Sequence, residues 1–204
     1  MTEFKDDLRR EKIIADWMDK YFYSKFNPSE IATKRPHEFG DKAREKRAQY
    51  GGVDIVMKDN DSKIYLIDEK SQTNYLNKNR PSFAFEIFSF SNEKVKKGWL
   101  LDSKKKTDYY ILIYPNSKKI GGYKELYDKE EIDFVSVYLI ERQKLLEEIY
   151  KIGLTNEKII EEASNLTEVN TLVNIKGIPP EKVSLYKSKK MEEIPVNLVV
   201  KKIS

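Results

Sequence analysis

The chain has 204 residues, no cysteine and one histidine, His37. Without cysteine it forms no disulfide bond and offers no thiolate to a metal ion. A single histidine excludes a histidine-rich zinc site and argues against a Ser-His-Asp triad. We expect His37 to be an ordinary polar loop residue, with contact to a substrate as the alternative. Catalytic chemistry therefore depends on carboxylates, lysine and tyrosine.

The sequence also lacks a long apolar run and a glycine-rich phosphate loop. No stretch approaches the length that crosses a bilayer, and the chain is charged from Glu3 onward, so we expect neither a signal peptide nor a membrane partner. A cytoplasmic protein is the default expectation. The length suits one domain with a substantial core, although 35% of the residues are charged.

Two short apolar runs, 53–57 and 64–67, flank a polar turn rich in Asp and Asn, a pattern typical of a β-hairpin. Charged residues interrupt both runs. Asp54 lies within the first, and Asp68, Glu69 and Lys70 end the second. Charges held against a core are costly unless they are paired or bind a metal ion. Their position therefore requires a chemical explanation.

Side-chain alternation along a strand predicts that Asp68, Lys70 and Gln72 share one face and that Glu69 points to the other. If the two strands pair across the turn, Asp54 approaches Asp68 on that shared face. Two carboxylates beside a lysine suit a hard cation such as Mg²⁺, which keeps several waters and commonly meets phosphate oxygens. A β-bulge would exchange the places of Asp68 and Glu69, so Glu69 is a lesser catalytic candidate. Gln72 is a candidate for positioning water.

This arrangement resembles the PD-(D/E)xK nuclease superfamily, in the variant that reads Gly-x-Asp, a hydrophobic hairpin, then Asp-x-Lys and a small residue. The matching positions are Gly52, Asp54, Asp68, Lys70 and Ser71. Val53 stands where the motif's name has proline. The close match is confined to the hairpin, and a looser pattern extends over residues 1–115.

The resemblance implies an α/β fold of the restriction-endonuclease type, with a mixed central β-sheet flanked by helices. It also implies hydrolysis of DNA phosphodiester bonds with Mg²⁺, or with Mn²⁺ in its place. Asp54 and Asp68 would bind the metal ion, and the backbone carbonyl of Glu69 would be a further ligand. Lys70 would orient or activate the attacking water.

Glu11 is a candidate third metal ligand. It falls on the apolar stripe of the helix predicted for residues 5–23, between Leu8 and Ile14. A helix-borne glutamate reaches the metal in some families with the resembled fold. The alternative, which we favour, is a glutamate at the edge of the stripe that pairs with a base.

The acid-x-Lys pattern alone carries little weight, because it occurs four times in this charged chain. Only Asp68 and Lys70 both follow an apolar run and have an Asp in a preceding strand at hairpin distance. The competing pair is Asp102 and Lys104, with Glu86 as the upstream partner, at the entry to a basic loop. An ion-paired strand end without a metal is the remaining alternative.

Two basic segments flank the proposed site. Residues 34–47 hold six Lys or Arg against three acids, and residues 94–106 hold six Lys against one acid. Such clusters bind phosphate backbones, so we expect DNA as the partner, with RNA as the alternative. A solvated lysine-rich surface would explain either segment taken alone. The candidate nucleic-acid-binding residues are Lys42, Arg44, Arg47, Lys104, Lys105 and Lys106.

The remaining elements follow from periodicity and from breaker residues. A charged helical stretch is predicted over 38–49. The predicted strands are 82–91, 99–102, 108–114 with Pro115 as its stop, 135–140, and an edge strand at 194–200. The predicted helices are 141–152 and one capped by Thr155 or Asn156 that runs to 163. We therefore predict a nuclease-like core over 1–140 and a helical extension with a terminal edge strand over 141–204, packed on the same domain.

The sequence thus predicts an Mg²⁺-dependent nuclease. One rival is a non-catalytic protein that keeps the fold and binds nucleic acid or another partner. A second rival is a nuclease that acts on RNA. The sequence leaves open whether the chain works as a monomer or as a homodimer.

Overall fold

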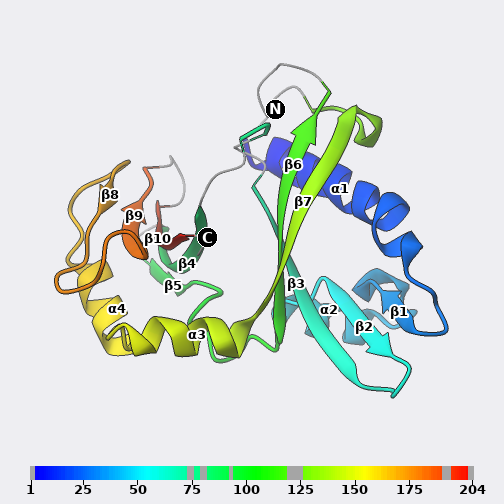
Figure 1. Cartoon of the computed structure of the whole chain (residues 1–204), viewed down its shortest axis with the longest axis horizontal. Helices are drawn as coiled ribbons and strands as arrows, with labels where there is room; N and C mark the ends of the chain where they lie inside the picture. Colours follow the sequence, from blue (N-terminus) through cyan, green and yellow to red (C-terminus); the bar gives the residue numbers. More distant parts are fainter. Residues whose placement is uncertain are drawn as a thin grey trace. The chain divides into compact units, whose positions relative to one another are not determined.

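The computed structural model describes residues 3–72, 76–78, 82–91, 94–118, 126–189 and 194–201. These residues form a mixed α/β structure with two five-stranded sheets (Figure 1). The chain divides into two compact units, Met1–Asn79 with Lys106–Arg142 and Arg80–Lys105 with Gln143–Ser204. Residues 80–105, which lie inside the predicted core segment 1–140, belong to the second unit. No helix of the described residues is long and apolar enough to cross a bilayer.

The sheet of the first unit contains both parallel and antiparallel pairs. Its strand order is β1-β2-β3-β6-β7, and only β3 and β6 are parallel. Parallel neighbours need a crossover connection, and here the connection between β3 and β6 includes Arg80–Lys105, which belongs to the second unit. The strands are β1 (Ile31–Lys34), β2 (Ile55–Asp59), β3 (Ile64–Ser71), β6 (Tyr109–Ser117) and β7 (Ile132–Glu141). The predicted mixed α/β class and the predicted hairpin of β2 and β3 are confirmed.

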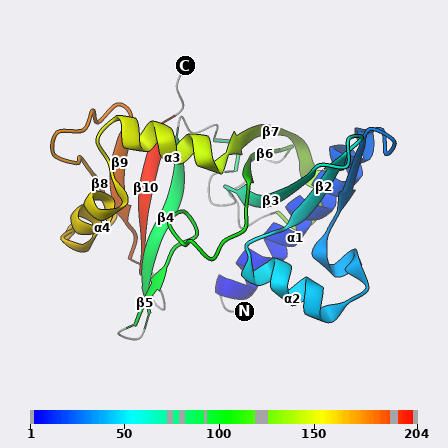
Figure 2. The same ribbon diagram turned by 90° about the horizontal axis from the view of Figure 1, so that it is seen from below.

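Helix α1 (Glu3–Tyr21) covers one face of this sheet (Figure 2). Its buried side chains Ile13, Ile14 and Met18 belong to one core cluster with isoleucines of four strands, among them Ile132 of β7. The others are Ile55 of β2, Ile67 of β3, and Ile111 and Ile113 of β6. The short 3-10 helix η1 (Tyr23–Lys25) follows α1 and adds Tyr23 to the same core.

The predicted helical stretch 38–49 is split in two. A 3-10 turn, η2 (Pro36–Phe39), ends at Gly40, and α2 (Lys42–Tyr50) then begins. Asp41 separates them because its side chain accepts hydrogen bonds from two backbone N–H groups of the first turn of α2. The helix ends in a turn in which Gly52 has a φ of 69°, a conformation that glycine adopts without strain. This turn delivers the chain to Asp54.

The second unit holds an antiparallel sheet in the order β5-β4-β10-β9-β8. Residue 142 of the first unit begins α3, and the rest of that helix belongs to the second unit. Thr155 caps α4 as predicted, since its side chain accepts a hydrogen bond from Lys158 N. The elements are β4 (Ser82–Ser91), β5 (Lys94–Lys97), α3 (Arg142–Lys151), α4 (Asn156–Ser164), β8 (Leu172–Val173), β9 (Val183–Lys187) and β10 (Ile194–Lys201); η5 (Lys129–Glu131) lies in the first unit.

Three predictions about strands are wrong. The predicted edge strand 194–200 is β10, which pairs with β4 on one side and β9 on the other. Pro195 is tolerated there because it is the second residue of the strand, next to its end. Residues 99–102 form a turn, in which Asp102 N donates to Gly98 O at 3.2 Å. Pro115 does not stop β6, because the described pairing of β3 with β6 ends at Ile113, and the missing N–H of the proline therefore interrupts none of those pairs.

Candidate active site

The hairpin of β2 and β3 brings the carboxyl groups of Asp54 and Asp68 together. Ile55 pairs with Ile67, and the N–H of Asp54, which precedes β2, donates to the O of the same Ile67 at 2.8 Å, one residue out of the regular register. By alternation Asp68 projects from the face opposite Ile67, and the carboxyl group of Asp54 lies within hydrogen-bonding reach of it. No register shift interrupts β3 in its pairing with β2 or β6, and Glu69 therefore keeps to the opposite face.

The two carboxylates and Lys70 form one hydrogen-bonded group. Asp68 is buried, with 2% of its surface exposed, and it accepts a hydrogen bond from Lys70 Nζ. The carboxyl groups of Asp54 and Asp68 lie close enough to share a hydrogen bond. Asp54 Oδ2 also accepts a hydrogen bond of 2.9 Å from Glu69 N, which fixes its orientation from the backbone of β3.

The proximity of the carboxylates changes the proton affinity of Asp68. Burial raises the pKa of Asp68 to about 7, Lys70 opposes this shift, and the negative charge of Asp54 adds to it. Burial lowers the pKa of Lys70, but Asp68 and Asp54 outweigh that effect and the net shift is upward. Lys70 therefore stays an ammonium, while the carboxylate pair holds a proton more readily than two separate aspartates would.

The donor set fits Mg²⁺ and does not fit a metal that needs a complete protein cage. In the described parts of the chain, no three His, Asp or Glu side chains converge closely enough to hold a metal ion. Mg²⁺ is commonly held by one or two carboxylates, with water and substrate phosphate completing its shell. A divalent cation would also relieve the repulsion between Asp54 and Asp68 that raises the pKa of Asp68.

Glu11 lies within electrostatic reach of this group, on α1. The residue as a whole is exposed, yet desolvation of its carboxyl group raises its pKa. Lys70 opposes that shift, and Asp7 and Asp54 add to it. Glu11 is thus close enough to respond to the charges of Lys70 and Asp54 without completing a three-carboxylate cluster.

Comparison of the chain with protein-family models, with curated proteins and with solved structures finds no match. The function must therefore be argued from the geometry of this chain alone.

Gln72 follows the end of β3 and keeps its backbone in the sheet. Its N–H donates to Ile113 O at 2.9 Å, which carries the β3–β6 ladder one step beyond Ser71. Its half-buried side chain therefore belongs, by strand alternation, to the face of Asp68 and Lys70. This is the position from which the sequence predicts a role in positioning water.

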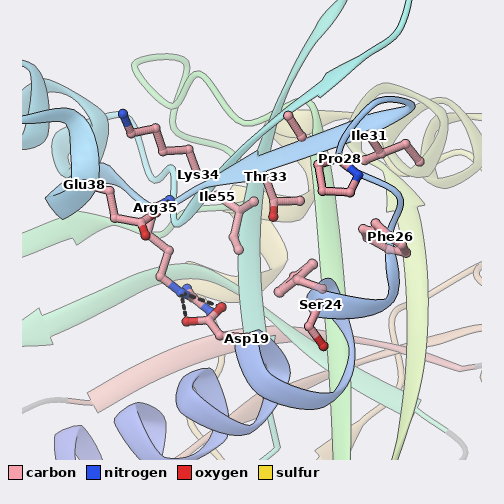
Figure 3. A pocket seen from close by; sticks show the side chains of 12 residues that line it. Asp19, Ser24, Phe26, Pro28, Ile31, Thr33, Lys34, Arg35, Glu38 and Ile55 are labelled. Carbon is pink, nitrogen blue, oxygen red and sulfur yellow. Dashed lines mark hydrogen bonds and ion pairs between the residues drawn. The ribbon is translucent and has the colours of Figure 1, made fainter.

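Glu69 is engaged on the opposite face, where α1 packs. Tyr23 Oη donates to Glu69 Oε1 at 2.8 Å, and Arg35 Nη1 donates to Glu69 Oε2 at 2.7 Å. Arg35 Nε also bonds both carboxylate oxygens of Asp19, at 2.9 and 2.7 Å. Figure 3 shows Arg35 and Asp19 pointing toward each other at a cavity of about 360 Å³ that Phe26 and Ile55 also line.

This network was missed from the sequence. Arg35 looks like one more cation of the basic segment 34–47, but its guanidinium is committed to two carboxylates, and its side chain is only 12% exposed. The only sequence signal was a buried acid at Glu69 that needs a partner. Since Glu69 N also bonds Asp54, the network supports the candidate site from behind the sheet.

The predicted phosphate-binding residues fall into two groups. Lys42, Arg44 and Arg47 lie on α2, and Lys106 is held beside the turn that precedes Asp54, because its N–H donates to Gly51 O at 2.8 Å. Lys104 and Lys105 belong to the second unit. The competing acid, Asp102, accepts a hydrogen bond of 3.0 Å from Lys104 N, as a turn residue does. His37 is an exposed residue of η2.

Proposed function

We propose that this chain is a Mg²⁺-dependent nuclease whose centre is formed by Asp54, Asp68 and Lys70. The main support is that the carboxylates of Asp54 and Asp68 converge. Asp68 is buried, its pKa is raised to about 7, and it accepts a hydrogen bond from Lys70 on the same strand. Structural ion pairs seldom place a second acid against a buried one, because the two negative charges repel each other. Active sites do so where a cation is to be bound.

The fold supports the same proposal. A helix covers a mixed sheet, and a hairpin of β2 and β3 is followed by a strand parallel to β3. This is the arrangement expected of a restriction-endonuclease-like core, and we propose that the first unit has that fold. Fold likeness alone does not carry function, so the proposal depends on the side chains.

The residues would divide the chemistry of phosphodiester hydrolysis as follows. Asp54 and Asp68 would hold Mg²⁺, which supplies Lewis acidity to the phosphate and to the attacking water when it is bound. Lys70 keeps its positive charge and is placed to position that water or to stabilise the charge that develops on the phosphate. Water attacks phosphorus, one P–O bond breaks, and the leaving oxygen takes up a proton. Gln72, by its place on the same face, would orient the water.

The proposal predicts cleavage that requires a divalent cation. Purified protein should cut supercoiled plasmid or single-stranded DNA with Mg²⁺ or Mn²⁺, and EDTA should stop the reaction because the carboxylates then have no cation to present. Gel electrophoresis of plasmid and of labelled oligonucleotides measures it. Cleavage of RNA alone would favour the second rival. Salt-sensitive binding without cleavage of any substrate would favour the non-catalytic rival and contradict the proposal.

The Asp68 pKa also predicts how Mg²⁺ affinity depends on pH. A metal ion needs the deprotonated carboxylate, so binding below about pH 7 must displace the proton that Asp68 holds in the metal-free protein. The apparent affinity should therefore rise by up to about tenfold per pH unit below about pH 7 and then level off. Calorimetric titration in buffers of different ionisation enthalpy measures the released proton. An affinity that does not change with pH would contradict this assignment.

A further inference from the structure

A second hollow, of about 410 Å³, lies on the first unit and is lined by residues of β1, η2 and α2. One aromatic ring and three cations form its lining. They are Phe39, Lys34, Arg44 and Arg47. An aromatic side chain among cations, with no acid in the lining, is a chemical combination that suits a planar ligand carrying negative charge.

Strand register places one wall of this hollow on the carboxylate face of the sheet. Lys34 of β1 pairs with Val56 of β2, and Val56 pairs with Leu66 of β3. Leu66 alternates with Asp68 along β3, so it shares the face of Asp68. Lys34 therefore projects from the same face as the candidate active site.

Chain connection brings the other wall close to Asp54. Arg47 O accepts a hydrogen bond of 2.9 Å from Gly51 N, at the turn that ends α2. Asp54 follows that turn directly, and Lys106 is bonded to the same turn through Gly51 O. A ligand in the hollow would thus lie beside the segment that leads into the active-site hairpin.

One acid, Asp41, lies near the three cations of the hollow. Arg44 makes one exposed contact, at 3.6 Å to Asp41. Lys34 and Arg47 are exposed, and Arg47 lies within electrostatic reach of the same Asp41, so one acid faces three cations. Three neighbouring positive charges repel one another, and an anion placed among them would relieve that repulsion.

We propose that this hollow holds one unpaired nucleotide of a single nucleic-acid strand, its base stacked on Phe39 and its phosphates bound by Lys34, Arg44 and Arg47. This inference rests on the proposed nuclease function and names its substrate class. The base faces of a duplex are covered by neighbouring base pairs, so a half-buried ring can stack only on a base that has left the helix. Duplex substrates are therefore disfavoured at this position.

The test is strand binding in EDTA, which separates binding from cleavage. Fluorescence anisotropy with short single strands of DNA and RNA and with the matching duplexes should show tighter binding of a single strand. Replacing Phe39 by Leu should weaken that binding about tenfold, since stacking contributes about 1–3 kcal/mol per base. Phe39→Tyr should bind as the wild type does. Phe134→Leu is the matched control, because Phe134 is an exposed phenylalanine of β7 that does not line the hollow.

A second variant keeps the test decisive if Phe39→Leu fails to fold. Arg47→Ala, at an exposed position, should lower the slope of log affinity against log salt by about one, because one phosphate contact is lost. Equal binding of single strand and duplex, or unchanged binding by both variants, would overturn the inference even if metal-dependent cleavage is found. Strand binding that depends on Phe39, without cleavage, would instead remove the nuclease function and keep the hollow as a strand-binding site.

Discussion

Asp68→Asn is expected to reduce metal-dependent cleavage by about a thousandfold or more while the protein stays folded. The substitution keeps the shape of the side chain and an acceptor oxygen for Lys70 Nζ, but it removes one of two negative charges that would hold Mg²⁺. Initial cleavage rates at saturating Mg²⁺, measured beside circular dichroism spectra of both proteins, test it. The loss should persist at high Mg²⁺, since Asp54 alone cannot fix the ion.

The same substitution has a predictable effect on stability. The folded-state pKa of Asp68, about 7, lies above the ordinary value of 3.8. Between these values the folded protein keeps a proton that the unfolded chain releases, so this group makes the metal-free wild type less stable as pH rises. Asp68→Asn removes that contribution. We expect the variant to equal or exceed the wild type in urea-unfolding free energy above about pH 7, a trade of activity for stability that marks a functional carboxylate.

Two matched variants keep this result specific. Asp61→Asn changes another acid-x-Lys pair, in the exposed turn of the same hairpin, and should leave cleavage unchanged. Asp102→Asn changes the competing pair and should also leave it unchanged. If Asp68→Asn cuts as well as the wild type and Asp102→Asn does not, the active centre lies at Asp102 and the present assignment is wrong.

The hairpin was predictable because its information is local. Alternating apolar residues and a polar turn suffice to predict that β2 pairs with β3, and the observed register confirms this pairing. The caps at Asp41 and Thr155 are also local, since each side chain bonds a backbone N–H of the next turn. Of these caps, only Thr155 was foreseen.

The second sheet was not predictable in the same way. Its central pair joins β4 to β10, with Phe85 opposite Leu198, residues far apart in the sequence. The local sequence of neither strand identifies its pairing partner. The sequence therefore predicted an edge strand at β10, although β10 pairs with β9 on its other side. The prediction that the strand stops at Pro115 was wrong for a related reason. A proline stops a strand only where a neighbouring strand needs its N–H, and here that depends on where β3 ends.

The charge pattern of the sequence likewise gives the number of basic residues in a segment, but it does not show which of them are paired with buried acids. Arg35, Arg44 and Arg47 are equivalent in a count of the basic segment, yet Arg35 is bonded to Asp19 and Glu69, while the other two line an open hollow with Phe39. The sequence places Phe39 between Glu38 and Gly40, with no apolar periodicity to give it a role. Only the meeting of β1, η2 and α2 shows that a ring and three cations belong together.

Arg35→Met is expected to cost about 3–5 kcal/mol of unfolding free energy, because it leaves buried Glu69 without its cation. The Glu69 side chain is 9% exposed and would keep only the hydrogen bond from Tyr23 Oη. Burial raises the pKa of Glu69, and Arg35 and Tyr23 now oppose that shift. Without Arg35 the pKa rises further, so the stability loss should be largest above that pKa and shrink in acid, where Glu69 is protonated. Urea unfolding at about pH 5 and about pH 8 measures this.

Lys20→Met is the matched control. Lys20 also pairs with a glutamate, Glu130 at 2.7 Å, but both side chains are about half exposed, at 49% and 55%. Solvent screens an exposed ion pair, which contributes little to stability, so the control should be nearly as stable as the wild type at both pH values. Adding Glu69→Gln to Arg35→Met should recover part of the loss, because the second change removes the unpaired buried charge. A loss in Arg35→Met that is the same at both pH values and is not relieved by Glu69→Gln would mean that Arg35 acts through packing alone. The guanidinium of Arg35 would then not be what holds the charge of Glu69 in place behind Asp54.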